Sequence, residues 1–174
     1  MTGGIVLAGG RSTRMGRDKA LVTVNGTPMA LRTASVLTQS GCAFVHVVGR
    51  QSALDNLGLS VIPDPITDIH HPLLGVAAAL ISIEADLLLF APCDLINLET
   101  QHVQALLSRG EPCVGAVNGQ VHPLLAVLPK DQGKRAQRFA MEGRSAREFV
   151  DGLPIVELPL PNINDANRPS DLPR

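Results

Sequence analysis

Short apolar runs alternate with segments of helical pattern along most of the chain. Five runs rich in Val, Ile and Leu predict buried strands: Gly4 to Ala8, Ala43 to Val48, Leu59 to Ile62, Asp86 to Ala91 and Pro112 to Val117. Helical patterns lie between them, and the clearest are Thr27 to Gly41, Leu73 to Ile83 and Glu99 to Ser108. This alternation predicts an α/β fold, a Rossmann-like three-layer sandwich in which helices cover both faces of a mostly parallel sheet.

Local signals refine this picture at three places. Thr27 can cap the first helix, and Pro28 suits its first turn. The pair Asn118-Gly119 predicts a tight turn, after which the segment Gln120 to Leu128 forms a strand antiparallel to the one before it. Beyond Lys130 helix-like segments continue, and the Pro- and Asn-rich segment Leu158 to Arg174 predicts an irregular terminal wrap.

Length and composition narrow the class of protein. With 174 residues, 45% of them hydrophobic, we expect one domain over residues 1–174. The 15 basic and 16 acidic residues leave no positive excess for binding nucleic acid, and Trp and Tyr are absent, so base stacking has little material. No apolar run has the length of a membrane span, and no signal peptide pattern follows Met1. We therefore expect a soluble cytoplasmic protein that binds neither membrane nor nucleic acid.

The three cysteines show neither CxxC nor Cys/His ligand spacing. Cys42, Cys93 and Cys113 are odd in number, and each lies in apolar surroundings. The sequence therefore predicts reduced thiols in the core rather than a disulfide or a zinc site.

The stretch LAGGRSTRMGRDK, from Leu7 to Lys19, follows the first predicted strand directly. Its glycines allow backbone N–H groups to approach a polyphosphate closely, while its Arg and Lys residues supply positive charge. The spacing of Gly10 and Gly16, with Arg17 next, fits neither a Walker A loop nor GxGxxG. A basic surface turn is the simpler alternative, but the position after the first strand favours a triphosphate site.

This stretch resembles the LAGGxSxRMGxDK signature of the pyrophosphorylase-type nucleotidyltransferases, and it is most similar to the molybdenum cofactor guanylyltransferase branch. The resemblance implies the nucleotide-diphospho-sugar transferase type of fold. It also implies that the backbone of Leu7, Ala8, Gly9 and Gly10 meets the nucleotide, with Gly9 marking the guanylyl branch, where cytidylyl relatives carry LAAG. Arg14 and Lys19 would act catalytically on the phosphates.

Carboxylates follow two of the predicted strands. Asp94 ends the apolar run LLLFAPCD, which places it at the same sheet edge as the glycine loop. Mg²⁺ binds one or two carboxylates together with phosphate oxygens and water, and the PxCD motif of the family implies that Asp94 is catalytic, binds nucleotide and holds Mg²⁺. A helix or turn cap is the alternative interpretation for Asp94. Asp64 matches a nucleotide-contacting Asp of the family, although Asp64-Pro65 also reads as a turn.

Further short motifs follow the order found in the family. Gly49 ends the second strand, and PLLG up to Gly75 resembles the GPLxG element near the base, with His71 in place of its first glycine. We interpret His70-His71 as a solvated loop pair, because adjacent residues do not normally face one ion together. His122 opens a segment similar to HPxxAL, towards the acceptor, and as a general base it competes with a structural role.

The string NRPSDL near the end resembles the family's NTPEDL, with Arg168 and Ser170 departing from it. The resemblance aligns Asp165 with a polar position before this string and makes Asp165 and Asn167 further candidate metal ligands, with Asn162 or Asn164 as alternatives for that role. Asn167 also reads as the cap of a short helix with Pro169 in its first turn.

The resemblance implies a Mg²⁺-dependent transfer of GMP from GTP to the terminal phosphate of molybdopterin or the molybdenum cofactor, with release of pyrophosphate. Such chemistry needs alignment and charge neutralisation more than a protein nucleophile. Apo-molybdoenzymes or other cofactor-biosynthesis proteins are the partners implied. Two alternatives stay open: another nucleotidyltransferase, acting with CTP or on a sugar phosphate or isoprenoid precursor, and a catalytically silent nucleotide-binding domain.

Overall fold

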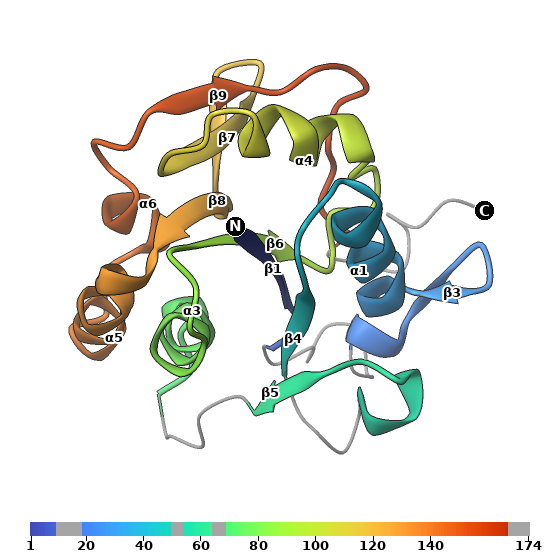
Figure 1. The fold of residues 1–174 in the computed structure, drawn as a ribbon, viewed down its shortest axis with the longest axis horizontal. Coiled ribbons are helices and arrows are strands. Elements are labelled where there is room, and N and C mark those ends of the chain that lie inside the picture. Colours follow the sequence, from blue (N-terminus) through green and yellow to red (C-terminus); the bar gives the residue numbers. More distant parts are fainter. Residues whose placement is uncertain (10–18, 50–53, 64–68, 167–174) are drawn as a thin grey trace.

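The structure is a computed structural model that describes residues 1–9, 19–49, 54–63 and 69–166. A seven-stranded sheet lies between two layers of helices (Figure 1). The strands of this sheet are β1 (Thr2–Leu7), β4 (Val45–Gly49), β5 (Val61–Pro63), β6 (Leu87–Pro92), β7 (Cys113–Val117), β8 (Gln120–Pro129) and β9 (Ile155–Glu157). The helices are α1 (Met29–Gln39), α3 (Pro72–Ser82), α4 (Thr100–Leu107), α5 (Gly133–Met141) and α6 (Ala146–Phe149). No helix in the described part of the chain combines the length and apolarity needed to cross a bilayer.

The strand order in the sheet is β5-β4-β1-β6-β8-β7-β9. β1, β4, β5 and β6 pair in parallel, whereas β8 is antiparallel to both β6 and β7, and β9 is parallel to β7. The prediction of a mostly parallel sheet with an antiparallel strand is therefore confirmed. The turn before β8 has the predicted form, since Asn118 and Gly119 have φ values of 51° and 74°.

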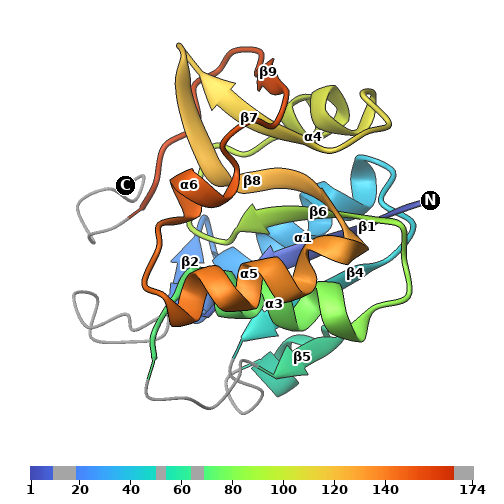
Figure 2. The same ribbon diagram turned by 90° about the vertical axis from the view of Figure 1, so that its left-hand side faces the viewer.

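The strands other than β9 supply side chains to two separate cores. In β1, Val6 packs in the cluster beneath α1 and α4, while its neighbour Ile5 packs in the cluster beneath α3, α5 and α6. Consecutive strand residues point to opposite faces, so a strand covered on both faces must be apolar throughout. This explains why the buried strands appear in the sequence as continuous apolar runs. Figure 2 shows α3 and α5 lying side by side over one face.

The first helix begins later than the sequence predicts. Thr27–Pro28 forms strand β3, which pairs with β2 (Thr23–Val24) in a small hairpin, and Pro28 precedes α1 without a side-chain cap bond. The predicted Thr27 cap is therefore wrong. The positive φ values of Asn25 and Gly26 identify the turn that makes this hairpin. The end of the helix is as predicted, because Gly41 follows it with φ of 99°.

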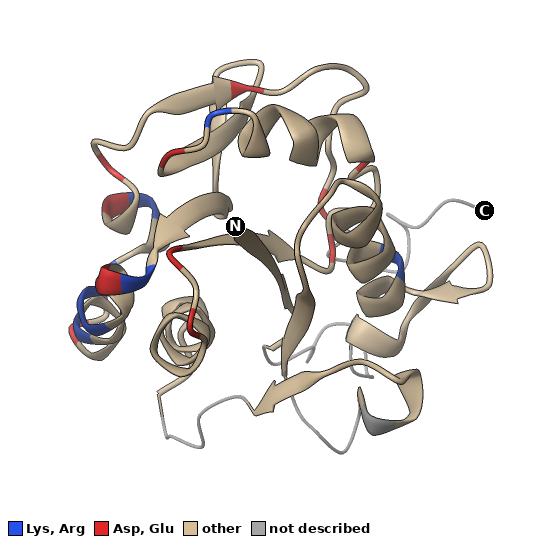
Figure 3. Ribbon diagram, in the orientation of Figure 1, with Lys and Arg blue, Asp and Glu red and all other residues tan. Residues whose placement is uncertain are grey.

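Most of the described Lys and Arg residues lie between Lys130 and Arg147, a segment that contains α5 and the start of α6 (Figure 3). Arg135 of α5 lies against the rings of both Phe139 and Phe149, at 4.7 and 4.6 Å from their centroids, and donates a hydrogen bond of 2.9 Å to the carbonyl oxygen of Phe149. These contacts fasten α6 onto α5. The charge of Arg135 thus contributes to internal packing between these two helices.

Candidate active site

Three parallel strands end together at the carboxyl edge of the sheet. Leu7, the last residue of β1, is paired with Val48 on one side and Pro92 on the other. The N–H of Ala8 donates to the carbonyl oxygen of Val48 at 2.8 Å, and the N–H of Cys93 donates to the carbonyl oxygen of Leu7 at 3.0 Å. The segments that follow β1 and β6, Ala8-Gly9 and Cys93-Asp94, therefore leave adjacent strands at one edge.

The C-terminal segment returns to this edge and meets Asp94. The N–H of Ala166 donates to the carbonyl oxygen of Asp94 at 2.9 Å, and Leu95 and Asp165 form an antiparallel bridge. In this bridge Asp165 lies opposite Leu95, and Asp94 is bonded to the next residue, Ala166. Asp94 is half-buried and Asp165 is exposed. Asp94 and Asp165 are remote in sequence but lie on backbone segments that pair with each other.

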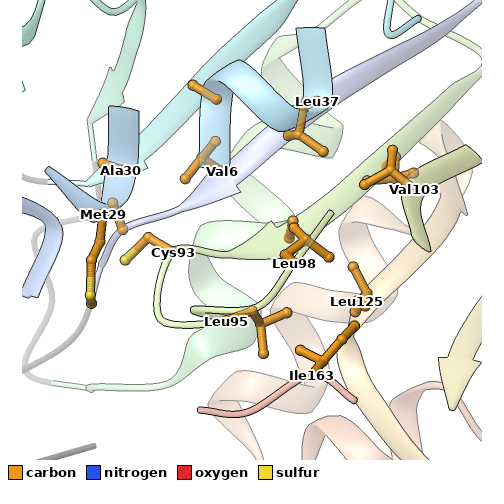
Figure 4. Close-up of a cluster of buried hydrophobic side chains, with 14 of the residues drawn as sticks. Val6, Met29, Ala30, Leu37, Cys93, Leu95, Leu98, Val103, Leu125 and Ile163 are labelled. Carbon is orange, nitrogen blue, oxygen red and sulfur yellow. The ribbon is translucent and has the colours of Figure 1, made fainter. Parts of the chain in front are cut away.

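Apolar side chains hold both segments in place. Cys93, Leu95 and Ile163 are buried members of one core cluster, and Figure 4 shows Leu95 and Ile163 side by side. The N–H of Ile96 also donates to the carbonyl oxygen of Asn164, at 3.1 Å. A rigid apolar base of this kind fixes the backbone that carries functional side chains.

Gly49 is the last residue of β4, which pairs with β1. A Cβ at this position would lie 2.8 Å from Cδ1 of Leu54 and 3.3 Å from Cβ of Ala8. Because both neighbours are buried, this glycine is explained by close packing between the ends of β4 and β1. Its predicted contact with nucleotide stays a prediction.

The N-terminus of α3 lies at the same edge, since this helix connects the end of β5 to the start of β6. His71 is the N-cap: its Nδ1 accepts a hydrogen bond of 3.2 Å from the N–H of Leu73, and Pro72 takes the first helical position. His71 is therefore a half-buried cap rather than half of the solvated pair expected, whereas His70 is exposed. Gly75 is buried within the helix.

His122 lies near the start of β8, which runs antiparallel to β6. The pairing of these two strands ends at Phe90 with Ala126, so the half-buried His122 extends past it towards the edge that carries Asp94. The role of His122 towards the acceptor stays a prediction.

Several predicted site residues lie outside the described residues, namely Gly10, Arg14, Asp64 and Asn167. The backbone of Lys19 begins the short helical turn η1 (Lys19–Leu21), but its side chain is not described. Ala20 is buried in the core, so the chain is anchored again directly after the loop. The structure therefore fixes both ends of the glycine-rich stretch.

Asn162 and Asn164 are the alternatives to Asp165 as a candidate metal ligand. Oδ1 of Asn162 accepts a hydrogen bond of 3.3 Å from the side chain of Asn118, and the main chain of Asn164 pairs with Ile96. Asp165 comes nearest to Asp94 along the paired backbone. The role of Asp165 as a ligand stays a prediction.

The donor set at this edge can be compared with the needs of a metal ion. Among the described residues no group of three or more His, Cys, Asp or Glu side chains could hold a metal. A zinc site of the usual kind requires such a cluster. Mg²⁺ requires only one or two carboxylates, with phosphate and water oxygens as the other ligands, and Asp94 and Asp165 fit that pattern.

All three cysteines are buried and none is in a disulfide, as the sequence predicts. Burial raises the pKa of the Cys42 thiol to about 11, and burial is also the main cause that raises the pKa of Cys113. The thiols of Cys42 and Cys113 are therefore protonated at neutral pH. They are therefore core residues and not nucleophiles or ligands.

A shallow cavity of about 250 Å³ lies at the opposite edge of the sheet. Its lining comes from Met1, Phe44, Glu84, Ala85, Asp86 and Lys130. These residues lie at or near the amino ends of β1, β4 and β6, away from Asp94. Ligands of α/β sheets bind at the carboxyl ends of the strands, so this cavity is not the candidate site.

Comparison with known proteins agrees with this arrangement. A family model described as the MobA-like NTP transferase domain matches residues 4–156. The molybdenum cofactor guanylyltransferase of Cupriavidus pinatubonensis is 39% identical over 171 residues, covering 85% of this chain and 86% of that protein. The enzyme of the same name from Ralstonia pickettii is 40% identical over 133 residues, covering 75% of this chain and 63% of that protein.

Among solved structures, the molybdopterin-guanine dinucleotide biosynthesis protein A of Archaeoglobus fulgidus superimposes with a TM-score of 0.73. The match covers 98% of this chain and 94% of that protein, at 19% sequence identity. At this level of identity the likeness concerns the fold. It confirms the predicted nucleotidyltransferase type of sandwich.

Proposed function

The chain belongs to the MobA-like NTP transferase family, and from that premise we propose that it transfers GMP from GTP to the terminal phosphate of molybdopterin or of its molybdenum-loaded form. An oxygen of the acceptor phosphate forms a bond to the α-phosphorus of GTP. The bond from that phosphorus to the oxygen bridging to the β-phosphate breaks, and pyrophosphate leaves. The product is a guanine dinucleotide form of the cofactor.

One observation supports this proposal above the others: Ala8-Gly9, Asp94 and Asp165 meet at one edge of the sheet. Backbone amides suit a polyphosphate, and carboxylates suit the cation that accompanies it. Phosphoryl chemistry of this type depends on alignment and charge neutralisation. A covalent protein nucleophile is not required.

The residue roles follow from this placement and from the family signature. The backbone of Leu7, Ala8, Gly9 and Gly10 binds the nucleotide. Arg14 and Lys19 bind its phosphates and stabilise the charge that develops during transfer. Gly49, Asp64 and Gly75 complete the nucleotide site.

Mg²⁺ is part of the proposal, and Asp94 and Asp165 would hold it, with Asn167 as a further candidate. When bound, the ion neutralises phosphate charge and orients the reacting groups. Asp94 lies at the end of a buried strand, so its backbone is fixed before substrate arrives. Asp165 is fixed in turn by the pairing of its segment with Leu95 and Ile96.

The proposed setting is the cytoplasm, which agrees with three buried cysteines that form no disulfide. Apo-molybdoenzymes or other cofactor-biosynthesis proteins are the proposed recipients of the product. A pull-down that compares loaded and unloaded protein would test this point.

The deciding experiment combines the purified protein with each of the four nucleoside triphosphates and molybdopterin, with and without Mg²⁺. Pyrophosphate release and formation of the dinucleotide are measured. We expect both only with GTP and the metal. A preference for CTP would favour a cytidylyltransferase, and turnover on sugar phosphates or isoprenoid precursors would favour another branch. Nucleotide binding without pyrophosphate release for any acceptor would indicate a silent domain.

A further inference from the structure

The segment that carries Asp165 is attached to the body of the protein by α4. We name residues 158–166 the C-terminal strap. At its start, the N–H of Leu158 donates to the carbonyl oxygen of Ala116 at 2.8 Å, and at its end the N–H of Ala166 donates to Asp94. Between these points the strap crosses the N-terminus of α4 (Figure 1).

Three successive carbonyl groups of the strap accept hydrogen bonds from the first turn of α4. Nε2 of His102 lies 3.0 Å from the carbonyl oxygen of Pro159 and 2.9 Å from that of Pro161. The side chain of Gln101 donates to the carbonyl oxygen of Leu160 at 2.9 Å. Because proline has no N–H, this part of the strap cannot pair with a neighbouring strand in a regular ladder. Its carbonyl groups are instead bonded to side-chain donors of α4.

Both ring nitrogens of His102 are committed. The N–H of Glu99 donates to Nδ1 at 2.9 Å, so Nδ1 must be an acceptor and Nε2 must carry the proton. The side chain is completely buried. A neutral His102 thus caps α4 with one nitrogen and holds the strap with the other.

The carbonyl groups held by His102 stand only a few residues before Asp165. Between them, Ile163 is buried in the core, and Ile96 donates to Asn164. The position of the strap at α4 therefore sets where its far end meets the loop after β6. A displacement at Pro161 would be passed to Asp165 through a short, tethered chain.

We propose that His102 is a positioning residue that sets the placement of Asp165 beside Asp94. It acts through the strap and touches no substrate. The importance of this placement for turnover rests on the proposed function. The physical link between His102 and the strap can be tested without substrate.

Two substitutions separate the two ring nitrogens. His102→Gln keeps a donor at the position of Nε2 and loses the acceptor at Nδ1, whereas His102→Asn keeps an acceptor near Nδ1 and loses the donor to the strap. If His102 acts through the strap, the Asn variant is the damaged one. If it only caps α4, the Gln variant is.

The first readout is amide hydrogen exchange without nucleotide or metal. In His102→Asn we expect the N–H groups of Ala166 and Ile96 to exchange about tenfold faster than in the wild type. The N–H of Leu158, which precedes the carbonyl groups bonded to His102, serves as the internal control and should change less than about twofold. Unchanged exchange at Ala166, or equal acceleration in His102→Gln, would overturn the proposal.

The second readout is GMP transfer. Misplacement of a metal-binding group by about 1 Å can cost up to about a hundredfold in rate, so we expect His102→Asn to lower kcat at least about tenfold, with KM for GTP within about threefold. His102→Gln should stay within about threefold of wild-type kcat. The reverse order of the two variants contradicts the proposal. If the wild type itself transfers no GMP, the proposed function fails and the exchange data alone decide the role of His102.

His102→Asn creates a change in the core, and its folding is checked by thermal unfolding. Should it not fold, Gln101→Ala replaces it, because Gln101 is exposed and its bond to Leu160 is the neighbouring strap contact. We then expect exchange at Ala166 to rise about threefold. His102→Gln then decides the role of His102, because about tenfold faster exchange at Ala166 in a variant that keeps the donor to the strap would overturn the proposal.

Discussion

The N–H of Ala166 donates a hydrogen bond of 2.9 Å to the carbonyl oxygen of Asp94. This bond joins the turn after a central strand to the last described part of the chain. It brings the backbone of Asp165 alongside the turn that carries Asp94. The following substitutions test what that arrangement and its surroundings contribute.

Asp94→Asn should abolish most turnover while leaving the fold intact. The substitution keeps the size of the side chain and removes the charge that would hold Mg²⁺, so we expect kcat to fall by about a hundredfold or more. Pyrophosphate release at saturating GTP measures this. Asp86→Asn, at the opposite edge of the sheet, is the matched control and should remain near wild type. Near-normal turnover of Asp94→Asn would contradict its proposed role.

Asp165→Ala should lower activity in the same direction but by less, because in the proposed site the exposed Asp165 would share the ion with Asp94 and with phosphate oxygens. We expect kcat to fall by about tenfold and the Mg²⁺ concentration for half-maximal rate to rise. A Mg²⁺ titration of the rate measures both. Asp151→Ala is the control, since Asp151 is an exposed carboxylate in the turn after α6. An unchanged Mg²⁺ requirement would exclude Asp165 as a ligand.

Gly49→Ala should destabilise the protein through overpacking. The added Cβ would lie 2.8 Å from Cδ1 of the buried Leu54 and 3.3 Å from Cβ of Ala8, so we expect a loss of about 1–3 kcal/mol in the free energy of unfolding. Urea denaturation measures the loss. In the Leu54→Ala background the same substitution should cost less. Equal costs in both backgrounds would show that contact with Leu54 is not the cause.

Arg135→Ala should loosen α6 from α5. It removes the cation over two aromatic rings and the bond to the carbonyl oxygen of Phe149, and we expect a loss of about 1–2 kcal/mol. Arg138→Ala on the same helix removes an exposed cation and should change stability by less than about 0.5 kcal/mol. The comparison of the two by urea denaturation is the test. Similar losses would mean that the ring contacts contribute nothing specific.

The buried thiols should make stability fall in alkaline solution. Burial raises the pKa of Cys42 to about 11, whereas the thiol of an unfolded chain titrates at about 8.5. Between these values the folded state holds a proton that the unfolded state has lost, so the free energy of unfolding decreases as pH rises through this window and is unaffected well below it.

Cys42→Ala removes this component, although the pKa of Cys113 is raised as well. We expect the drop in unfolding free energy between pH 8 and pH 10.5 to be smaller in the variant, by a difference on the order of 1 kcal/mol. Urea denaturation at the two pH values measures it. Equal drops in both proteins would show that Cys42 does not titrate differently on folding.

Much of the fold could be predicted because buried parallel strands are apolar on both faces. β1 and β6 appear in the sequence as unbroken apolar runs, and their ends were predicted within two residues. The short strands β2, β3 and β9 were missed because they do not form such apolar runs. β9 is exposed at Ile155 and Glu157, and β2 and β3 have two residues each, so none of the three shows a periodic pattern.

The site could be predicted only in part. Asp94 was found because it ends an apolar strand, and that position is a matter of local sequence. The role of His102 had no such signal, since one histidine within a helical pattern is equally suited to many structural positions. Its partners, Pro159 and Pro161, are remote in sequence and become neighbours only in three dimensions. The roles proposed for Gly10, Arg14, Asp64 and Asn167 stay predictions.

The late position of the strap has a consequence for biosynthesis. A nascent chain that ends at Pro159 already contains every strand of the sheet and Asp94, but not yet Asp165. The two acids can meet only after translation has passed beyond the prolines that His102 holds. A product that ends at this length would therefore lack the second acid of the proposed magnesium site.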